Sequence, residues 1–283
     1  MKTKTTQNRL MVLAAGMSSR MRAESEQNID SKLVSQANSL PKCMIGLGKN
    51  NRPFLDYLLY NTVQGGIEEV ILLLNLTDNY TQNYYEQNKI SGLEILFARQ
   101  HIPKSRTKPL GTSDAILQVL SQHSDWQESR FMVCNSDNIY PSKVFEILSK
   151  EGSNRMVAFD ADGYEEVRVR NCAIVQTDED GFLIDLIEKP TDEEWLHIKT
   201  TMPQIGISWN IFGLNAPEVI SVLENTPLHP VRQEKELPVS IRMMVQNNPK
   251  SMEVVRVSDA IPDLTSKADI AEVQRFLEIN FDF

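Results

Sequence analysis

Five short apolar runs, each bounded by polar or turn-forming residues, constrain the fold of this chain more than any other feature. They cover residues 10–14, 70–74, 93–98, 131–134 and 156–159. Continuous apolar runs of this length are typical of strands that are buried on both faces of a sheet. Helix-like stretches separate them, at residues 52–64, 113–120 and 141–149. We therefore predict an α/β fold in which helices cover both faces of a mostly parallel sheet.

The second half of the chain has a different pattern. Residues 167–177 and 182–188 alternate between apolar and polar side chains, and an Asp-Glu-Asp-Gly turn separates them. This pattern predicts a β-hairpin, and residues 206–214 predict a further strand. Helical patterns follow at residues 216–224, 235–246 and 266–278. No long linker or internal repeat interrupts the sequence, so we expect a single domain over residues 8–283.

Charge and cysteine content disfavour several classes of protein. The net charge of −9 disfavours a nucleic-acid partner. The widely spaced Cys43, Cys134 and Cys172 form no CxxC pair, which predicts a reducing compartment and no zinc site. No apolar segment approaches the length of a membrane span, and the polar residues 1–7 lack the apolar core of a signal peptide. We expect a cytoplasmic protein without a membrane partner, and a homo-oligomer is compatible with the sequence.

The loop after the first apolar run is suited to binding phosphate. Gly16 lies two residues beyond that run's Ala14, and small residues there let backbone amides approach phosphate oxygens. Arg20 adds a cation at the end of the loop. The loop matches neither the P-loop nor the GxGxxG pattern, so a tight strand-to-helix turn is the alternative interpretation.

Asp137 follows the apolar run 131–134 and is a candidate metal ligand. A carboxylate at a strand end can hold Mg²⁺, which needs few protein ligands because it keeps waters and uses substrate oxygens. An ordinary turn is the alternative. Lys42 follows Pro41, whose fixed backbone stiffens the approach. Together, Arg20 and Lys42 would neutralise charge on a reacting α-phosphate.

Five motifs in this order resemble those of the sugar-1-phosphate nucleotidyltransferases. They are the loop from Ala14 to Arg20, Pro41-Lys42, Gly111-Thr112, Ser136-Asp137-Asn138 and Glu188-Lys189-Pro190. The resemblance covers about residues 8–275 and implies a Rossmann-like, three-layer α/β/α nucleotidyltransferase fold with a mostly parallel mixed sheet. It also implies a nucleotide-binding half at about 8–150 and a β-rich, sugar-phosphate-binding half at about 151–283.

The same resemblance implies an activity and a set of site residues. The expected enzyme joins a nucleoside triphosphate to a sugar 1-phosphate and releases pyrophosphate, with Mg²⁺ as cofactor and no covalent intermediate. The implied catalytic residues are Arg20, Lys42, Asp137 and Lys189. The implied nucleotide-binding residues are Ala14, Ala15, Gly16, Gln100, Gly111, Thr112 and Asp114. The implied sugar-phosphate-binding residues are Ala173, Glu188, Lys189 and Asn210. The implied metal ligands are Asp137 and Asp263, with Asp259 in reserve.

Two departures from the family pattern leave other functions open. Ser18 and Ser136 stand where the family usually has glycine. One alternative is a non-catalytic sensor of nucleotide or sugar phosphate, although the retained Arg20, Lys42 and Asp137 favour an enzyme. The other is a cytidylyltransferase acting on phosphocholine or another phosphorylated alcohol, whose choline pocket would need aromatic residues.

Two polar segments, 22–40 and 101–109, are predicted to be surface loops. The first joins Arg20 to Lys42, both of which are expected to bind phosphate. We therefore expect residues 22–40 to order when nucleotide binds and to close over it.

Overall fold

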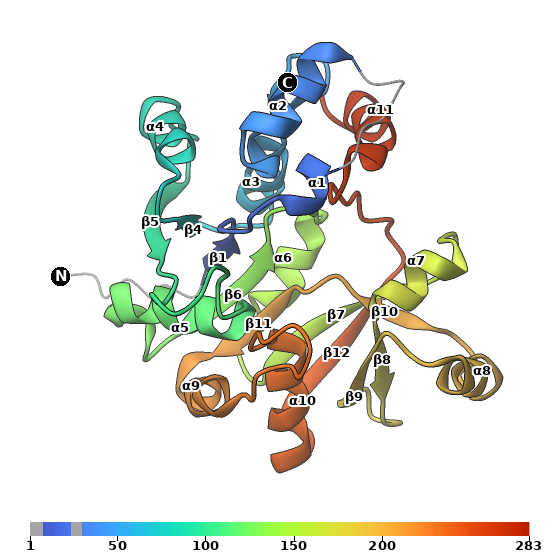
Figure 1. Ribbon diagram of the computed structural model, residues 1–283. Helices are drawn as coiled ribbons and strands as arrows, with labels where there is room; N and C mark the ends of the chain where they lie inside the picture. The colour runs from blue at the N-terminus through green and yellow to red at the C-terminus, as the bar shows by residue number, and fades with distance from the viewer. Residues whose placement is uncertain (1–7, 24–29, 283) are drawn as a thin grey trace.

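Ten strands form one mixed sheet through the middle of the computed structural model, which describes residues 8–23 and 30–282 (Figure 1). Their order is β5-β4-β1-β6-β11-β7-β10-β8-β9, and β12 pairs with β7 off this path. The first five in the chain are β1 (Arg9–Leu13), β4 (Glu69–Asn75), β5 (Glu94–Gln100), β6 (Arg130–Asn135) and β7 (Asn154–Asp160). The others are β8 (Ala173–Thr177), β9 (Leu183–Glu188), β10 (Gly206–Ser208), β11 (Phe212–Asn215) and β12 (Met252–Val257). A separate ribbon joins β2 (Gly46–Leu47) to β3 (Arg52–Pro53).

The strands of the first half are parallel, as predicted. β1 lies between β4 and β6 and is parallel to both, and β4 is parallel to β5. Alternate side chains of β1 enter different cores, because successive residues of a strand point to opposite faces. Leu10 and Val12 lie in one core and Met11 in the other, and all three are fully buried. Burial on both faces explains why these strands are continuously apolar in the sequence.

Helices cover both faces of the sheet. α3 (Phe54–Gln64) and α6 (Ser142–Leu148) supply buried side chains to one core. α5 (Thr112–Gln122), α9 (Ala216–Asn225) and α10 (Leu237–Asn247) supply side chains to the other. Figure 1 shows α3 above the sheet and α9 and α10 below it. The predicted three-layer α/β/α nucleotidyltransferase fold is therefore confirmed.

The antiparallel pairings are concentrated in the second half. β11 is antiparallel to its neighbours β6 and β7, and β10 is antiparallel to β7 and β8. The predicted hairpin of β8 and β9 is present, but it begins later than predicted. Residues 166–171 form helix α7 (Glu166–Asn171), in which Val169 is buried and Val167 is 72% exposed. The spacing of these two valines resembled a strand, yet only one of them joins the core.

The strand predicted at 206–214 is divided into β10 and β11. Residues 209–211 separate the two strands, and Asn210 has a left-handed backbone with φ of +54°. A residue in this conformation ends the extended strand. The break sets Asn210 apart from the regular sheet pairing.

The segment 22–40, predicted as a loop, contains the end of one helix and the whole of another. They are α1 (Ser19–Ala23) and α2 (Ser31–Ser39), and residues 24–29 of this segment lie outside the described residues. Asp30 caps α2 by accepting a hydrogen bond from the Lys32 amide at 2.8 Å, and Ala37 is buried. The polar composition concealed this helix because few side chains supply its apolar contacts, namely the buried Ala37 and the partly buried Leu33. Whether the segment closes over nucleotide stays a prediction.

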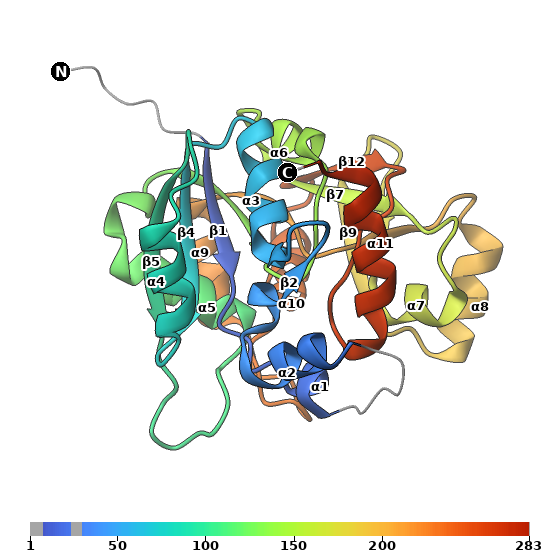
Figure 2. The ribbon, with the colours of Figure 1, turned by 90° about the horizontal axis from the view of Figure 1, so that it is seen from above.

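Other elements were not predicted from the sequence. They include α4 (Asn79–Gln87), α8 (Asp192–Thr201) and β12, together with the 3₁₀ turns η1 (Lys42–Met44), η2 (Ser124–Trp126) and η3 (Lys267–Asp269). The last helix, α11 (Ile270–Asn280), begins after η3 and packs in a third core with residues of α1, α2 and α3. Figure 2 shows α1 and α2 side by side, with α11 next to them.

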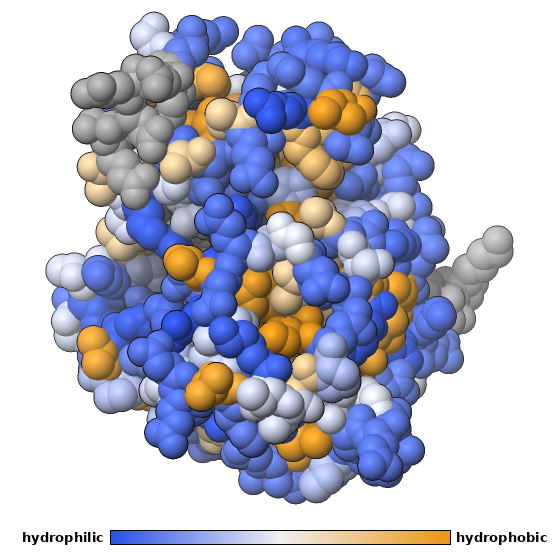
Figure 3. Space-filling view, turned by 90° about the vertical axis from the view of Figure 1, so that its right-hand side faces the viewer, coloured by the Kyte–Doolittle hydropathy of each residue, from blue (hydrophilic) through white to orange (hydrophobic). Residues whose placement is uncertain are grey.

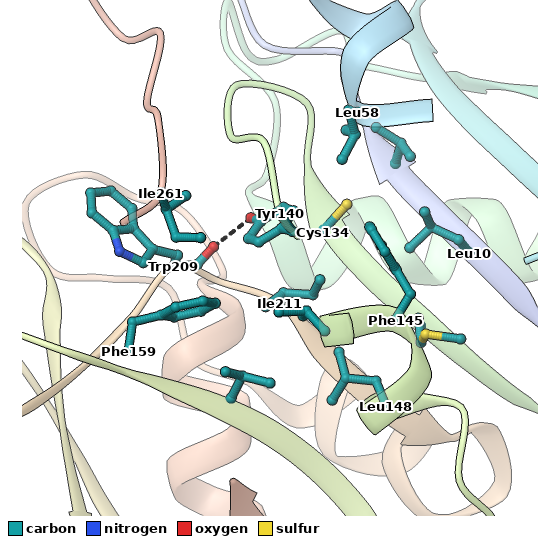
Figure 4. Close-up of a cluster of buried hydrophobic side chains, with 14 of the residues drawn as sticks. Leu10, Leu58, Cys134, Tyr140, Phe145, Leu148, Phe159, Trp209, Ile211 and Ile261 are labelled. Carbon is teal, nitrogen blue, oxygen red and sulfur yellow. Dashed lines mark hydrogen bonds between the residues drawn. The ribbon is translucent and has the colours of Figure 1, made fainter. Parts of the chain in front are cut away.

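One buried hydrogen bond ties the two halves together. The Tyr140 hydroxyl, in the loop after β6, donates to the Trp209 carbonyl between β10 and β11 at 2.6 Å (Figure 4). Phe159, Ile211 and Phe145 are buried in the same core. The buried hydroxyl is thereby satisfied. This contact fixes the segment that carries Asp137 relative to the segment that carries Asn210.

The face in Figure 3 is largely hydrophilic, with apolar side chains in small groups. Over the described parts of the chain, no helix is long and apolar enough to cross a membrane.

Candidate active site

A cleft of about 490 Å³ opens at the carboxyl ends of β1, β5 and β6. This is where ligands bind in sheets of this type. Eleven of the predicted site residues line it: Ala14, Ala15, Gly16, Arg20, Lys42, Gln100, Gly111, Thr112, Asp137, Glu188 and Asn210. They come from both halves of the chain, so folding brings the expected nucleotide side and sugar side together.

The loop after β1 borders the cleft and is anchored at both ends. The Ala14 amide donates to the Leu73 carbonyl at 2.9 Å, and the Ser18 hydroxyl accepts from the Lys42 amide at 3.3 Å. A Cβ added at Gly16 would meet no atom within 4 Å, so glycine there leaves space for a ligand. Ser18 has φ of +52°, a conformation that favours glycine. This backbone explains why a glycine is expected at the position that Ser18 occupies.

Lys42 and Asp137 form an ion pair within the cleft. Lys42 lies in η1, whereas Asp137 follows β6. Their side chains are only 17% and 15% exposed, so water screens their charges weakly. The backbone of Asp137 is also fixed, because its carbonyl accepts from the Leu264 amide at 2.8 Å. Folding therefore brings Lys42, a predicted phosphate ligand, into contact with Asp137, the predicted metal ligand.

Asp263 lies beside Asp137. Residues Asn138 and Asp263 form a β-bridge, and the Asp263 Oδ1 accepts from the Thr265 hydroxyl at 2.9 Å. Burial, followed by the charge of Asp137, raises the pKa of Asp263 to about 6. The other oxygen of Asp263 lies 3.6 Å from the Arg168 guanidinium, and the reserve candidate Asp259 pairs with Lys143. Of the two candidates, the structure brings Asp263 to Asp137.

The neighbouring carboxylates of Asp137 and Asp263 fit a magnesium ion. Their oxygens are hard ligands, and Mg²⁺ commonly takes one or two carboxylates together with waters and phosphate oxygens. Burial is the main cause of the raised pKa of Asp263, and repulsion from the charge of Asp137 adds to it. A cation between them would offset this repulsion. No group of three or more His, Cys, Asp or Glu side chains suited to a metal occurs among the described residues.

Gly111 and Thr112 approach the cleft through close backbone packing. Gly111 has φ of +108°, and a Cβ there would lie 2.3 Å from the Lys235 carbonyl oxygen. The Thr112 hydroxyl accepts from the Leu237 amide at 2.8 Å. Gln100, the last residue of β5, is buried and lines the cleft. Asp114 lies outside the cleft lining, where its carboxylate accepts from the Gln118 amide at 2.7 Å.

The expected sugar side is more open. Glu188 and Asn210 line the cleft, and the buried Oδ1 of Asn210 has no hydrogen-bond partner in the described parts of the chain. Lys189 is exposed, has φ of +47° and does not line the cleft. Ala173 is buried and pairs with Glu188 across the hairpin. The structure therefore gathers two of these four residues at the cleft wall.

The segment between α9 and α10, residues 226–236, contributes residues that the motifs did not indicate. We call it the strap. Arg232, Glu234 and Glu236 of the strap line the cleft. The Arg232 guanidinium lies 2.7 Å from Glu236 and 3.5 Å from Glu188. Burial, followed by the charge of Glu188, raises the pKa of Glu236 to about 7.

Backbone hydrogen bonds hold the strap against the Gly111 loop. The Lys235 amide donates to the Leu110 carbonyl at 2.5 Å, and its carbonyl accepts from the Ser113 amide at 3.0 Å. The sequence contains one sign of the strap's role, because charged residues of alternating sign occur at 232–236, shortly before Pro238. The helical pattern predicted at residues 235–246 includes residues 235 and 236, but α10 begins at Leu237, and Glu236 lines the cleft.

Comparison with known proteins gives a consistent result. A family model described as nucleotidyl transferase matches residues 31–207. The bifunctional protein GlmU of Methanococcus maripaludis is 26% identical over 216 residues, which are 76% of this chain and 44% of that relative. The chain thus spans less than half the length of that curated relative.

Two solved structures share the fold. A UTP-bound UGPase from Acinetobacter baumannii has a TM-score of 0.70 at 18% identity, covering 97% of this chain and 94% of the other. HddC from Yersinia pseudotuberculosis, complexed with GMP-PN, has a TM-score of 0.63 at 16% identity, covering 95% and 99%. The family match confirms what the order of motifs predicted: this chain belongs to the nucleotidyl transferase family of enzymes.

Proposed function

We propose that this enzyme transfers a nucleotidyl group from a nucleoside triphosphate to a sugar 1-phosphate, forming a nucleoside-diphosphate sugar and pyrophosphate. One observation carries the proposal. A single cleft contains Lys42 and Asp137 from the first half of the chain and Glu188 and Asn210 from the second. Lys42 could bind oxygens of a triphosphate and Asp137 the Mg²⁺ that accompanies it, whereas Glu188 and Asn210 suit sugar hydroxyls.

In this reaction, an oxygen of the sugar phosphate attacks the α-phosphorus of the triphosphate. A new P–O bond forms as the bond to pyrophosphate breaks, with the two oxygens in line. Arg20 and Lys42 would bind phosphate oxygens and neutralise charge as the bonds change. Bound Mg²⁺, held by Asp137 and Asp263, would supply further positive charge. Catalysis would therefore come from positioning and electrostatics.

The opposite wall would position the acceptor. The Glu188 carboxylate can accept hydrogen bonds from sugar hydroxyls, as can the buried Asn210 Oδ1. Arg232 lies beside Glu188 and holds its carboxylate in place. Lys189 follows Glu188 directly and would reach the sugar phosphate from the end of the hairpin.

The cleft favours a sugar over choline as the acceptor. No aromatic side chain occurs among the described residues that line it. Recognition of a quaternary ammonium normally uses such side chains as a cage. The polar lining instead provides carboxylates and an amide, which suit hydroxyl groups.

A matrix of nucleoside triphosphates against hexose 1-phosphates, with Mg²⁺ and pyrophosphate release as the readout, tests the proposal. We expect release that requires both substrates and increases strongly for one pairing. Phosphocholine with CTP should give no release. Binding of both ligands without turnover in any pairing would instead identify a sensor.

A further inference from the structure

Two glutamines of helix α5 cover the open edge of the sheet. β5 is the first strand in the order of the sheet, so no described strand lies on its outer side. The Arg99 amide donates to the Gln122 side-chain oxygen at 2.9 Å, and the Gln122 side chain donates back to the Arg99 carbonyl at 2.8 Å. In the same way, the His101 amide donates to Gln118 at 2.7 Å, and the His101 carbonyl accepts from Gln118 at 3.0 Å. We call Gln118 and Gln122 the glutamine pair. It supplies the hydrogen bonds that a neighbouring strand would otherwise supply.

The glutamine pair holds the backbone on both sides of Gln100. This residue lies between Arg99 and His101, ends β5 and is only 6% exposed, yet it lines the cleft. No hydrogen bond within the described residues uses its side-chain amide. A buried amide that can both donate and accept is suited to the polar edge of a nucleobase. The position of this amide in the cleft is therefore set by a stretch of backbone that the glutamine pair restrains.

Asp114 determines which way the Gln118 amide faces. The Asp114 Oδ2 accepts a hydrogen bond from the Gln118 Nε2 at 2.7 Å. An ionised carboxylate can only accept, so it selects the nitrogen of the amide and leaves the Gln118 oxygen for the His101 N–H. Asp114 was among the residues expected to bind nucleotide, yet it does not line the cleft. Its contacts indicate an indirect role, through Gln118 and the backbone beside Gln100.

The same bonds hold the start of the segment that borders the cleft after β5. Lys108 and Pro109 of this segment line the cleft. Its middle is tied to the strap, because the Arg106 guanidinium donates to the Gln233 carbonyl. The end next to β5 is held by Gln118. Loosening Gln118 would therefore move more of the cleft wall than a single side chain.

We propose that the glutamine pair and Asp114 are positioning residues for nucleobase recognition. Asp114 orients Gln118, the pair fixes the backbone, and the Gln100 amide is thereby held against one edge of the base. None of the three lines the cleft, so they act through Gln100. The inference rests on the proposed function, because it takes the ligand of the cleft to be a nucleoside triphosphate. A site that hydrogen-bonds one base discriminates only while its polar groups keep their geometry.

Calorimetric titration of the full chain with UTP, dTTP, CTP, ATP and GTP, each with Mg²⁺, tests the inference. Discrimination is the ratio of the weakest Kd to the tightest, and we expect at least about 100-fold for the wild type. Gln118→Glu keeps the length of the side chain but replaces the donating nitrogen by an oxygen, which would face the His101 carbonyl and the Asp114 carboxylate. It should lower the ratio at least about tenfold, and Asp114→Ala should lower it about threefold.

His123→Ala is the matched control. The His123 ring bonds to the Phe97 carbonyl at 3.1 Å, on the same strand but further from Gln100. This variant removes one contact from the strand and should leave the discrimination unchanged. Thermal unfolding measures the stability that each variant loses. A lower melting temperature in Gln118→Glu, with Kd ratios equal to those of the wild type, would show a purely structural role and overturn the proposal.

Two further variants complete the test. Gln122→Ala breaks the bonds to Arg99 and should also lower the ratio, so it decides the question if Gln118→Glu does not fold. Gln100→Ala should abolish the discrimination, and discrimination that survives this change would overturn the inference.

The same titrations separate the inference from the proposed function. If Gln100→Ala loses the discrimination while Gln118→Glu and Gln122→Ala keep the wild-type ratio, the inference is wrong and the proposed function stands. Equal binding of all the triphosphates by the wild type has the same meaning. Failure of the wild type to bind any triphosphate would instead refute the proposed function, and the inference with it.

Discussion

The two walls of the cleft are built differently. On the first wall, Gln100 ends the parallel strand β5, Asp137 follows the parallel strand β6, and Lys42 lies in the turn η1; all three are largely buried. On the second wall, Glu188 lies at the end of an edge hairpin, and Arg232 lies on the strap. The first wall is therefore supported on several sides, whereas the second has free edges. Under the proposed function, a site built in this way would hold the reacting phosphates firmly and would let the acceptor side vary.

Replacing Asp137 tests the rigid wall with the largest expected effect. Asp137→Asn keeps the shape of the side chain but removes the charge that pairs with Lys42 and would hold Mg²⁺. We expect turnover to fall at least about 100-fold, or about 2.7 kcal/mol. Asp162→Asn, at an exposed residue outside the cleft, should retain wild-type activity. If Asp137→Asn keeps more than about a tenth of the activity, the metal role is wrong.

Replacing Lys42 on the first wall and Lys189, which follows Glu188 of the second, tests whether the two sides bind different substrates. Lys42→Ala should weaken triphosphate binding and Lys189→Ala should weaken sugar-phosphate binding, each at least about tenfold, because a charged contact to phosphate is lost. Calorimetric titration of each ligand into each variant measures both. Loss of sugar-phosphate binding in Lys42→Ala, with triphosphate binding unchanged, would reverse the assignment.

Two glycines on the nucleotide side test whether close backbone packing, at Gly111, and open space, at Gly16, have different roles in the cleft. Gly111→Ala places a Cβ 2.3 Å from a strap carbonyl and should destabilise the fold by about 2 kcal/mol or more. Gly16→Ala meets no atom within 4 Å, so it should change the melting temperature little but weaken nucleotide binding by filling the space. Thermal unfolding together with nucleotide titration separates the two effects. Equal loss of stability in both variants would contradict the packing described.

The smallest expected effect concerns Glu236 on the strap. Its pKa is raised from 4.5 to about 7, so folding favours the protonated carboxyl. Its stabilising contribution is complete below about pH 4.5 and is lost as the pH rises through 7. Glu236→Gln should therefore be more stable than wild type at pH 8, by about 1 kcal/mol once the neighbouring Arg232 is allowed for. At pH 4.5 the two should unfold alike. Thermal unfolding at both values checks the sign, and a less stable variant at pH 8 would contradict it.

The sequence predicted the centre of the sheet better than its margins. β1, β4 and β6 are covered on both faces, so their residues form continuous apolar runs. β12 pairs with β7 along one edge, and its residues Glu253 and Arg256 interrupt the apolar pattern. Helix α2 buries Ala37 fully and Leu33 in part, and most of its other side chains are polar. Such elements are stabilised by tertiary contacts that local patterns do not reveal.

The candidate site shows the same limit. Asp137 was predicted from its place after an apolar strand, and Gln100 from the family resemblance; both lie at the edge of the sheet where the parallel strands end. Arg232 and Glu236 were not, because the strap reaches the cleft through long-range contacts. The Leu237 amide, for instance, bonds to Thr112, which is 125 residues away in the chain. No local pattern encodes that pairing.

In the ion pair between Lys42 and Asp137, each side chain is the counterion of the other. Each charge neutralises the other, so neither is left uncompensated in this largely buried part of the cleft. An anion that takes the lysine exposes the aspartate, and a cation that takes the aspartate exposes the lysine. Separating the pair therefore costs least when an anion binds Lys42 and a cation binds Asp137 at the same time.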